Sequence, residues 1–115
     1  MARQNGWVGF VNIELTEKEK KAVKQKMLTA ELWYDWCETQ VGNGYKITQS
    51  YDRERECFVV TMTCHNQDLP NYGYSMSQRH RFLGVAIAAL VYVHEEKTAA
   101  DDWGAEKERQ LQFDW

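Results

Sequence analysis

The sequence predicts an α+β fold, with an antiparallel sheet of three to four strands and two helices packed on one face, in the order β-α-β-β-(β)-α. Apolar and polar residues alternate over 7–15, 45–51 and 56–64, which is typical of strands with one buried face. Elsewhere apolar residues recur every three or four positions, which is typical of helices. The 115 residues suffice for one domain, predicted to span 1–96, with an acidic tail or short helix over 97–115.

The first strand and first helix are predicted from local signals. Over 7–15, the side chains of Val11, Ile13 and Leu15 share one face. Thr16 and Glu19 have the spacing of a capping box, which predicts that a helix begins there and continues to about residue 40. Its apolar stripe is Val23, Met27, Ala30, Tyr34, Cys37 and Val41, and the glycines at 42 and 44 end it.

A hairpin follows, with strands at about 45–51 and 56–64 around the turn DRER. Alternation gives it an apolar face that we expect to pack mostly against the helices, made of Tyr45, Ile47, Tyr51, Phe58, Val60, Met62 and Cys64. The opposite face is small, polar and open to solvent. YGYSMS is compatible with a short third strand, and Ser75 or Ser77 is expected to cap a final helix over about 78–96.

The final helix is apolar on nearly all sides, and its longest apolar run covers 83–93. Such a run is too short to span a membrane, so the pattern predicts a buried helix and no membrane partner. One small sheet covers only part of such a helix. A homo-oligomer formed through the last helix is therefore expected, with cover by the C-terminal segment as the alternative.

Features of an enzyme or metalloprotein are absent from the pattern. Cys37, Cys57 and Cys64 are odd in number and form no C-x-x-C, which favours reduced thiols and a cytoplasmic location. His80 and His94 would lie roughly 21 Å apart on one helix, too far to share a metal. The acidic residues of the hairpin turn alternate with arginines, as in a solvated turn. No catalysis, metal or cofactor is expected.

Basic residues instead indicate nucleic-acid binding. Net charge is +1 over residues 1–94 and −4 over 95–115. The cations expected to neutralise phosphates are Lys20, Lys21, Lys24, Lys46, Arg53, Arg55, Arg79 and Arg81. The rings expected to stack bases are Trp7, Phe10 and Tyr74. A solvated helix surface is the alternative interpretation of the lysines, because Glu17 and Glu19 lie among them.

Two resemblances add to this interpretation. The predicted order α-β-β-β-α, with GYSMSQRHRFLGVAIAAL leading into an alanine-rich helix, resembles double-stranded-RNA-binding domains. It departs from them where their lysine cluster is reduced to Arg79 and Arg81. The run of FVNIELTEKEK, GYKITQSYD, NYGYSMS and ALVYVHEE is similar to small uncharacterised proteins from phage and viral metagenomes that are associated with single-stranded-DNA binding.

The second resemblance implies a phage-encoded protein in the host cell cytoplasm. The ending QFDW resembles the acidic tails of single-stranded-DNA-binding proteins, which recruit a protein partner and compete with DNA. We therefore expect binding of single-stranded nucleic acid, DNA before RNA, without strong sequence preference, and control of access by the tail from Asp101 to Trp115. The alternative is a protein-interaction module, an adaptor or inhibitor of a host or phage protein, favoured by the acidic charge and the wide apolar last helix.

Overall fold

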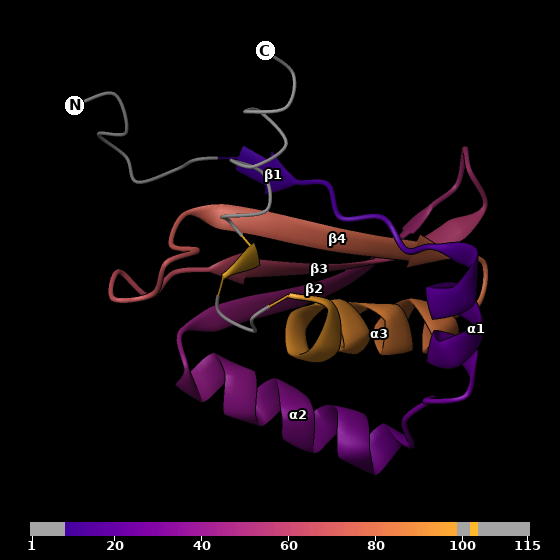
Figure 1. The fold of residues 1–115 in the computed structure, drawn as a ribbon, viewed down its shortest axis with the longest axis horizontal. Helices are drawn as coiled ribbons and strands as arrows, with labels where there is room; N and C mark the ends of the chain where they lie inside the picture. Colours follow the sequence, from indigo (N-terminus) through magenta and orange to yellow (C-terminus); the bar gives the residue numbers. More distant parts are fainter. Residues whose placement is uncertain (1–8, 99–101, 104–115) are drawn as a thin grey trace.

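The computed structural model describes residues 9–98 and 102–103. Its elements are β1 (Gly9–Val11), α1 (Glu17–Lys24), α2 (Ala30–Gly42), β2 (Tyr45–Asp52), β3 (Cys57–Cys64), β4 (Tyr74–His80), α3 (Leu83–Tyr92) and the π-helical turn η1 (Val93–Lys97). One four-stranded sheet in the order β1-β4-β3-β2 lies over the helices, which cover one of its faces (Figure 1). The α+β class is confirmed.

The prediction of a purely antiparallel sheet is wrong, because β1 pairs with β4 in parallel. The first strand is also shorter than the predicted 7–15. Beyond Val11 the side-chain amide of Gln78 donates to the Ile13 carbonyl (2.9 Å), so a side chain takes the position of a ladder bond. Val11 and Ile13 are buried, as the alternation predicted.

The hairpin agrees with the prediction in position and register. β2 and β3 pair antiparallel from Tyr45 opposite Cys64 to Asp52 opposite Cys57, and the Asp52 carboxylate caps the turn by accepting the amides of Glu54 and Arg55 (3.0 and 3.2 Å). The predicted core face holds only in part. Tyr51 is 50% exposed and packs edge-on against the Phe58 ring, at the end where the hairpin rises away from the helices (Figure 1).

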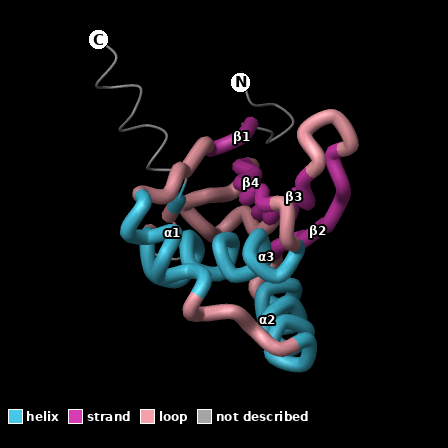
Figure 2. The backbone as a smooth tube through the Cα atoms, turned by 90° about the vertical axis from the view of Figure 1, so that its right-hand side faces the viewer, coloured by secondary structure: helices cyan, strands magenta, loops and turns pink. Residues whose placement is uncertain are grey.

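The single helix predicted from residue 16 to 40 is two helices. α1 ends at Lys24, and Thr29 begins α2 by accepting the Leu32 amide with its hydroxyl (3.2 Å). Figure 2 shows the loop between them turning the chain from α1 to α2. The predicted stripe is therefore broken. Val23 is buried, whereas Met27, Tyr34 and Val41 are exposed.

The last helix begins later than predicted, and Ser75 and Ser77 do not cap it. Both serines lie in β4, where their hydroxyls pair across the sheet with Thr63 and Thr61 (2.7 Å each). α3 begins at Leu83, after Phe82, without a side-chain cap. The predicted helix start was wrong because strand β4 continues through His80.

The wide apolar surface of α3 is covered within the chain. Leu90 and Ala86 are fully buried in the cluster that contains Val60 and Met76 of the sheet. On another side Ala88 and Ala89 pack with Val23 of α1. The observation from which we predicted an oligomer through the last helix is thus accounted for without a second chain.

The folded unit extends past residue 96, although 97–115 was predicted to be an acidic tail or a short helix outside the domain. Trp103 is fully buried, and its indole N–H donates to Nδ1 of the buried His94 (3.0 Å). The remainder of the predicted tail, apart from Lys97, Thr98 and Asp102, lies outside the described residues. Within the described ranges no helix has both the length and the apolar character that a membrane span requires.

Candidate nucleic-acid interface

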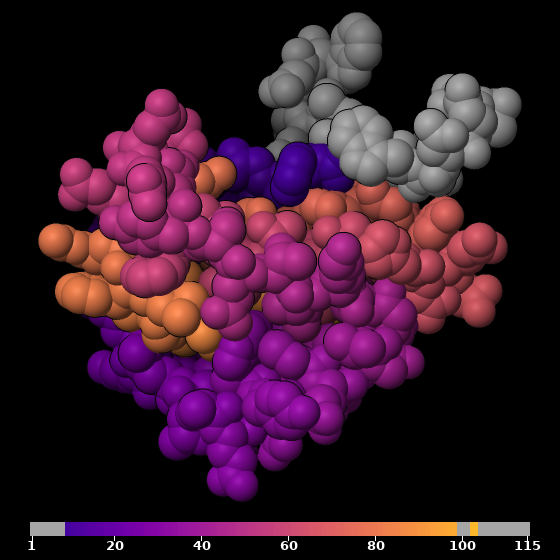
Figure 3. All heavy atoms as spheres, turned by 180° about the vertical axis from the view of Figure 1, so that it is seen from behind, coloured from indigo at the N-terminus to yellow at the C-terminus, as the bar shows by residue number. Residues whose placement is uncertain are grey.

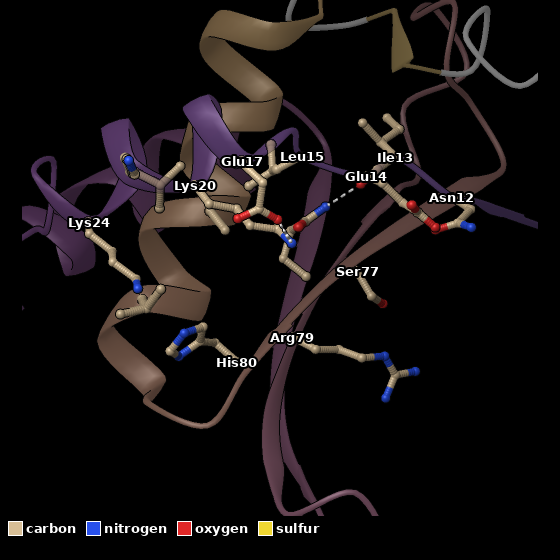
Figure 4. A pocket seen from close by; sticks show the side chains of 15 residues that line it. Asn12, Ile13, Glu14, Leu15, Glu17, Lys20, Lys24, Ser77, Arg79 and His80 are labelled. Atoms are coloured by element: carbon tan, nitrogen blue, oxygen red, sulfur yellow. Dashed lines mark hydrogen bonds and ion pairs between the residues drawn. The ribbon is translucent and has the colours of Figure 1, made fainter.

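A cleft of about 580 Å³ lies beside the outer end of β4, between α1, α3 and the segment that joins β1 to α1 (Figure 4). We call it the α1–β4 cleft. Its lining carries four cations and two carboxylates, a net charge of +2 in a chain whose net charge is −3. These groups are Lys20, Lys21, Lys24, Arg79, Glu14 and Glu17.

The position of α1 fixes the three lysines on one wall of the cleft. The predicted capping box is present: Thr16 Oγ1 accepts the Glu19 amide (3.1 Å) and Glu19 Oε1 accepts the Thr16 amide (2.8 Å). Lys97 of η1 also donates to the Glu19 carboxylate (2.8 Å), which holds the pKa of that carboxyl below its ordinary value. With Val23 buried beneath, α1 cannot rotate without breaking these contacts.

The other wall is the end of β4 that β1 does not cover. Alternation along the strand directs Ser77 and Arg79 to the outer face of the sheet, and His80 to the side of Lys24 and α3 (Figure 4). Arg79 Nη1 lies 3.3 Å from Asp52 Oδ2, so the hairpin turn positions this guanidinium. The sequence pattern placed Arg79 on the last helix, whereas it lies in β4.

His80 is the histidine of the cleft lining. Burial lowers its pKa, and the nearby charges of Lys24 and Arg81 lower it further. The Phe82 amide donates to His80 Nδ1 (3.0 Å), which fits an imidazole that is neutral at pH 7. Protonation at lower pH would add a positive charge to the cleft wall.

Phe82 supplies an aromatic surface next to the cleft. Its ring is 61% exposed, lies 5.6 Å from the His80 ring and has the Arg81 guanidinium 5.6 Å from its centroid. Phe82 was not among the predicted stacking rings, because the apolar pattern placed it on the surface of the last helix. The signal was the period-two alternation of YSMSQRH, which extends the strand and leaves Phe82 in the following turn.

The remaining predicted site residues do not line the cleft. Arg53 and Arg55 are exposed at the hairpin tip, where Arg55 Nη1 lies 3.5 Å from Asp52 Oδ2. Lys46 lies on the outer face of β2, opposite Thr63. Phe10 is 61% exposed on the outer face of β1.

One of the predicted stacking rings is not part of this surface. Tyr74 is 9% exposed and belongs to the core, so its prediction as a base-stacking residue is wrong. Its side chain points to the helices because β4 continues the alternation in which Met76 and Gln78 also face inward. Trp7 lies outside the described residues.

The part of the chain that the structure describes contains no group of three or more metal-ligating side chains. No protein-family model matches the chain, and neither a curated protein nor a solved structure matches it significantly. The two resemblances stated from the sequence therefore stay predictions, and the argument for function comes from the geometry of the cleft.

Proposed function

We propose that this protein binds single-stranded nucleic acid, DNA rather than RNA, without strong sequence preference. The observation that carries the proposal is the α1–β4 cleft, which is lined by Lys20, Lys21 and Lys24 of α1. Arg79 of β4 also lines it, with its guanidinium directed to the outer face of the sheet. Mobile cations of this kind bind phosphates by releasing condensed counterions. A cluster of four in an acidic protein supports a bound polyanion.

The exposed ring of Phe82 supports a single strand over a duplex. Bases in a duplex are stacked on one another, whereas an unpaired base can stack on an aromatic side chain, which contributes about 1–3 kcal/mol. Phe82 lies beside both Arg81 and His80 at the edge of the cleft. A strand that stacks one base on Phe82 would direct its adjacent phosphates toward Lys24.

The open outer face of the sheet would have a secondary part. Its centre is formed by hydroxyl side chains that bond to one another, Thr61 with Ser77 and Thr63 with Ser75. Lys46 and Phe10 lie on this face, and Arg79 connects it to the cleft. Such a face can contact a sugar–phosphate backbone, but it contributes little stacking area.

Fluorescence anisotropy of labelled oligo-dT, oligo-U and a duplex at 50 and 200 mM salt tests the proposal. With four phosphate contacts the logarithmic salt slope should be roughly −3, so affinity for oligo-dT should fall roughly 50-fold between the two conditions. The alternative, a protein-interaction module, predicts no binding to any of the three. A preference for the duplex, or no binding at 50 mM salt, would contradict the proposal.

Two variants in the cleft region and one control variant locate the binding site. Lys21→Gln with Lys24→Gln removes two cleft cations, and Phe82→Ala removes the ring, so each should weaken binding at least about fivefold. Lys18→Gln with Arg53→Gln changes the net charge equally, but neither residue lines the cleft. Equal losses in the two double variants would show that overall charge, and not the cleft, accounts for binding.

A further inference from the structure

β2 is an edge strand of the sheet that the described residues form. β2 pairs with β3 over eight residues without a bulge, and among the described strands it has no neighbour on its other side. The Gly44 carbonyl accepts the His65 amide (2.8 Å), and ladder bonds recur at every second residue. The N–H and C=O groups of Ile47, Gln49 and Tyr51 therefore point away from β3.

This edge lacks the devices that commonly prevent strand addition. Proteins protect exposed edges with proline, charged residues, bulges or very short strands. β2 is long and regular, and the five residues ITQSY between Lys46 and Asp52 contain neither a charge nor a proline. Lys46 and Asp52, at the two ends of this stretch, carry opposite charges.

An apolar helix flank lies on the same side of the molecule. Ala30, Tyr34, Cys37 and Val41 recur at spacings of 4, 3 and 4 along α2, and Tyr34 and Val41 are 63% and 60% exposed. Trp36 of the neighbouring flank packs on the core and donates to Glu95 of η1 (3.1 Å), so the apolar flank faces away from η1. Figure 2 shows α2 below β2, and Figure 3 shows the two together on one face.

The edge of β2 is complementary to itself. If two copies of β2 pair antiparallel with a two-fold axis at Gln49, Ile47 faces Tyr51 on the helix side of the sheet. On the outer face Thr48 then faces Ser50, and Lys46 faces Asp52 of the other copy. Apolar, hydroxyl and opposite-charge pairs all stabilise an antiparallel ladder, and this register provides all three.

We propose that a second copy of this chain docks on this β2–α2 surface, defined by Tyr34, Cys37, Val41, Ile47, Gln49 and Tyr51. The two sheets would become one continuous sheet, with the apolar flanks of the two α2 helices in contact below it. Glu31 and Glu38 are exposed and border this flank, so they would lie at the rim of the contact. The proposal does not depend on nucleic-acid binding and moves the predicted oligomer from α3 to β2 and α2.

Light scattering coupled to size exclusion at 10 and 100 µM tests the dimer, whose mass would be twice 13.6 kDa. Tyr34→Lys places a charge in the contact and should give a monomer. Leu32→Lys is the matched control: Leu32 is 57% exposed on the opposite flank of α2, so this variant should stay dimeric. Gln49→Pro removes an outward N–H without removing a β3 bond and should also give a monomer.

Cross-linking tests the register. Gln49→Cys would lie opposite its own copy, within the Cα separation of 4.4–6.8 Å that a disulfide needs, so mild oxidation should give a dimer band that reductant removes. Ser50→Cys faces Thr48 in the proposed register and should cross-link no more than wild-type protein, whose native thiols set the background. A wild-type monomer at 100 µM, a dimer that survives both Tyr34→Lys and Gln49→Pro, or equal cross-linking at 49 and 50 would overturn the proposal.

Discussion

The surroundings of β4 differ from those of β2, the strand at the other end of the sheet. The part of β4 that the short β1 does not cover carries Gln78 and Arg79, and the lysines of α1 line the cleft beside it. Next to β2 the described chain places no strand, and the adjacent flank of α2 is apolar. Positive charge beside a strand disfavours the addition of another strand and favours the binding of a polyanion, whereas an uncharged strand edge favours the addition of a further strand. One small sheet can thus support two kinds of interaction without competition between them.

The largest predicted effect comes from the core on which both the α1–β4 cleft and the β2–α2 surface rest. Trp103→Ala removes a fully buried indole and the donor of His94 Nδ1, so the free energy of unfolding should fall by about 3–5 kcal/mol. Nucleic-acid binding and dimerisation should then weaken together. Urea unfolding measures the loss, and Leu32→Ala, at an exposed position, should change it by less than about 0.5 kcal/mol. A loss below about 1 kcal/mol would contradict the placement of Trp103.

The second prediction tests whether the α1–β4 cleft and the β2–α2 surface act independently. Lys21→Gln with Lys24→Gln should weaken oligo-dT binding about tenfold at 50 mM salt and leave the mass of the dimer unchanged. Tyr34→Lys should have the converse effect, giving a monomer whose affinity per chain for a short oligonucleotide stays within about twofold. Anisotropy and light scattering on both variants measure this. If either variant changed both the affinity for oligo-dT and the mass of the dimer, the two surfaces would not be independent.

The hairpin and the start of α1 could be predicted from the sequence because both depend on neighbouring residues. Asp52 caps the turn two and three residues ahead, and Thr16 with Glu19 closes a capping box. The break before α2 had a local signal that was not used. Thr29 is a hydroxyl residue that accepts the Leu32 amide, yet an apolar spacing of 4 and 3 across residues 23–30 matched one continuous helix.

The parallel pairing of β1 could not be predicted, since Val11 and Met76 are 65 positions apart and nothing local specifies the direction of the pair. The candidate site was predicted in part. Lys20, Lys21 and Lys24 follow from the helix period, but Arg79 lines the same cleft only because β4 runs on through His80. The outward flank of α2 was taken for its core face, because periodicity identifies an apolar stripe without showing what covers it.

A third and smaller effect concerns the contact that holds the cleft wall. Lys97 donates to Glu19 between two partly buried side chains, so Lys97→Met should lower stability at pH 7 by about 1 kcal/mol. Because Lys97 first, and then the Thr16 amide, lower the pKa of Glu19 in the folded protein, this stabilisation is present above the ordinary pKa of 4.5 and is lost as pH falls through the lowered value.

Urea unfolding of wild-type protein and Lys97→Met between pH 3 and 7 checks the sign. The difference between the two should be largest at pH 7 and should shrink toward pH 3. Loosening of α1 should also weaken oligo-dT binding without changing the mass of the dimer, because α1 packs against α3 and lies on the other side of it from β2 (Figure 2). A difference that grows on acidification would contradict the assigned pKa direction.

The smallest effect is expected at the hairpin tip, which joins the two edges through Arg79, Asp52 and Arg55. Glu56 has a φ of 52°, in the left-handed region that glycine adopts without strain. Glu56→Gly should therefore raise the free energy of unfolding by about 0.5–1 kcal/mol, whereas Glu54→Gly, where φ is not positive, should lower it. Because the turn fixes both the Arg79 side chain and the end of β2, this variant should leave affinity and dimer mass unchanged while making both edges more resistant to urea.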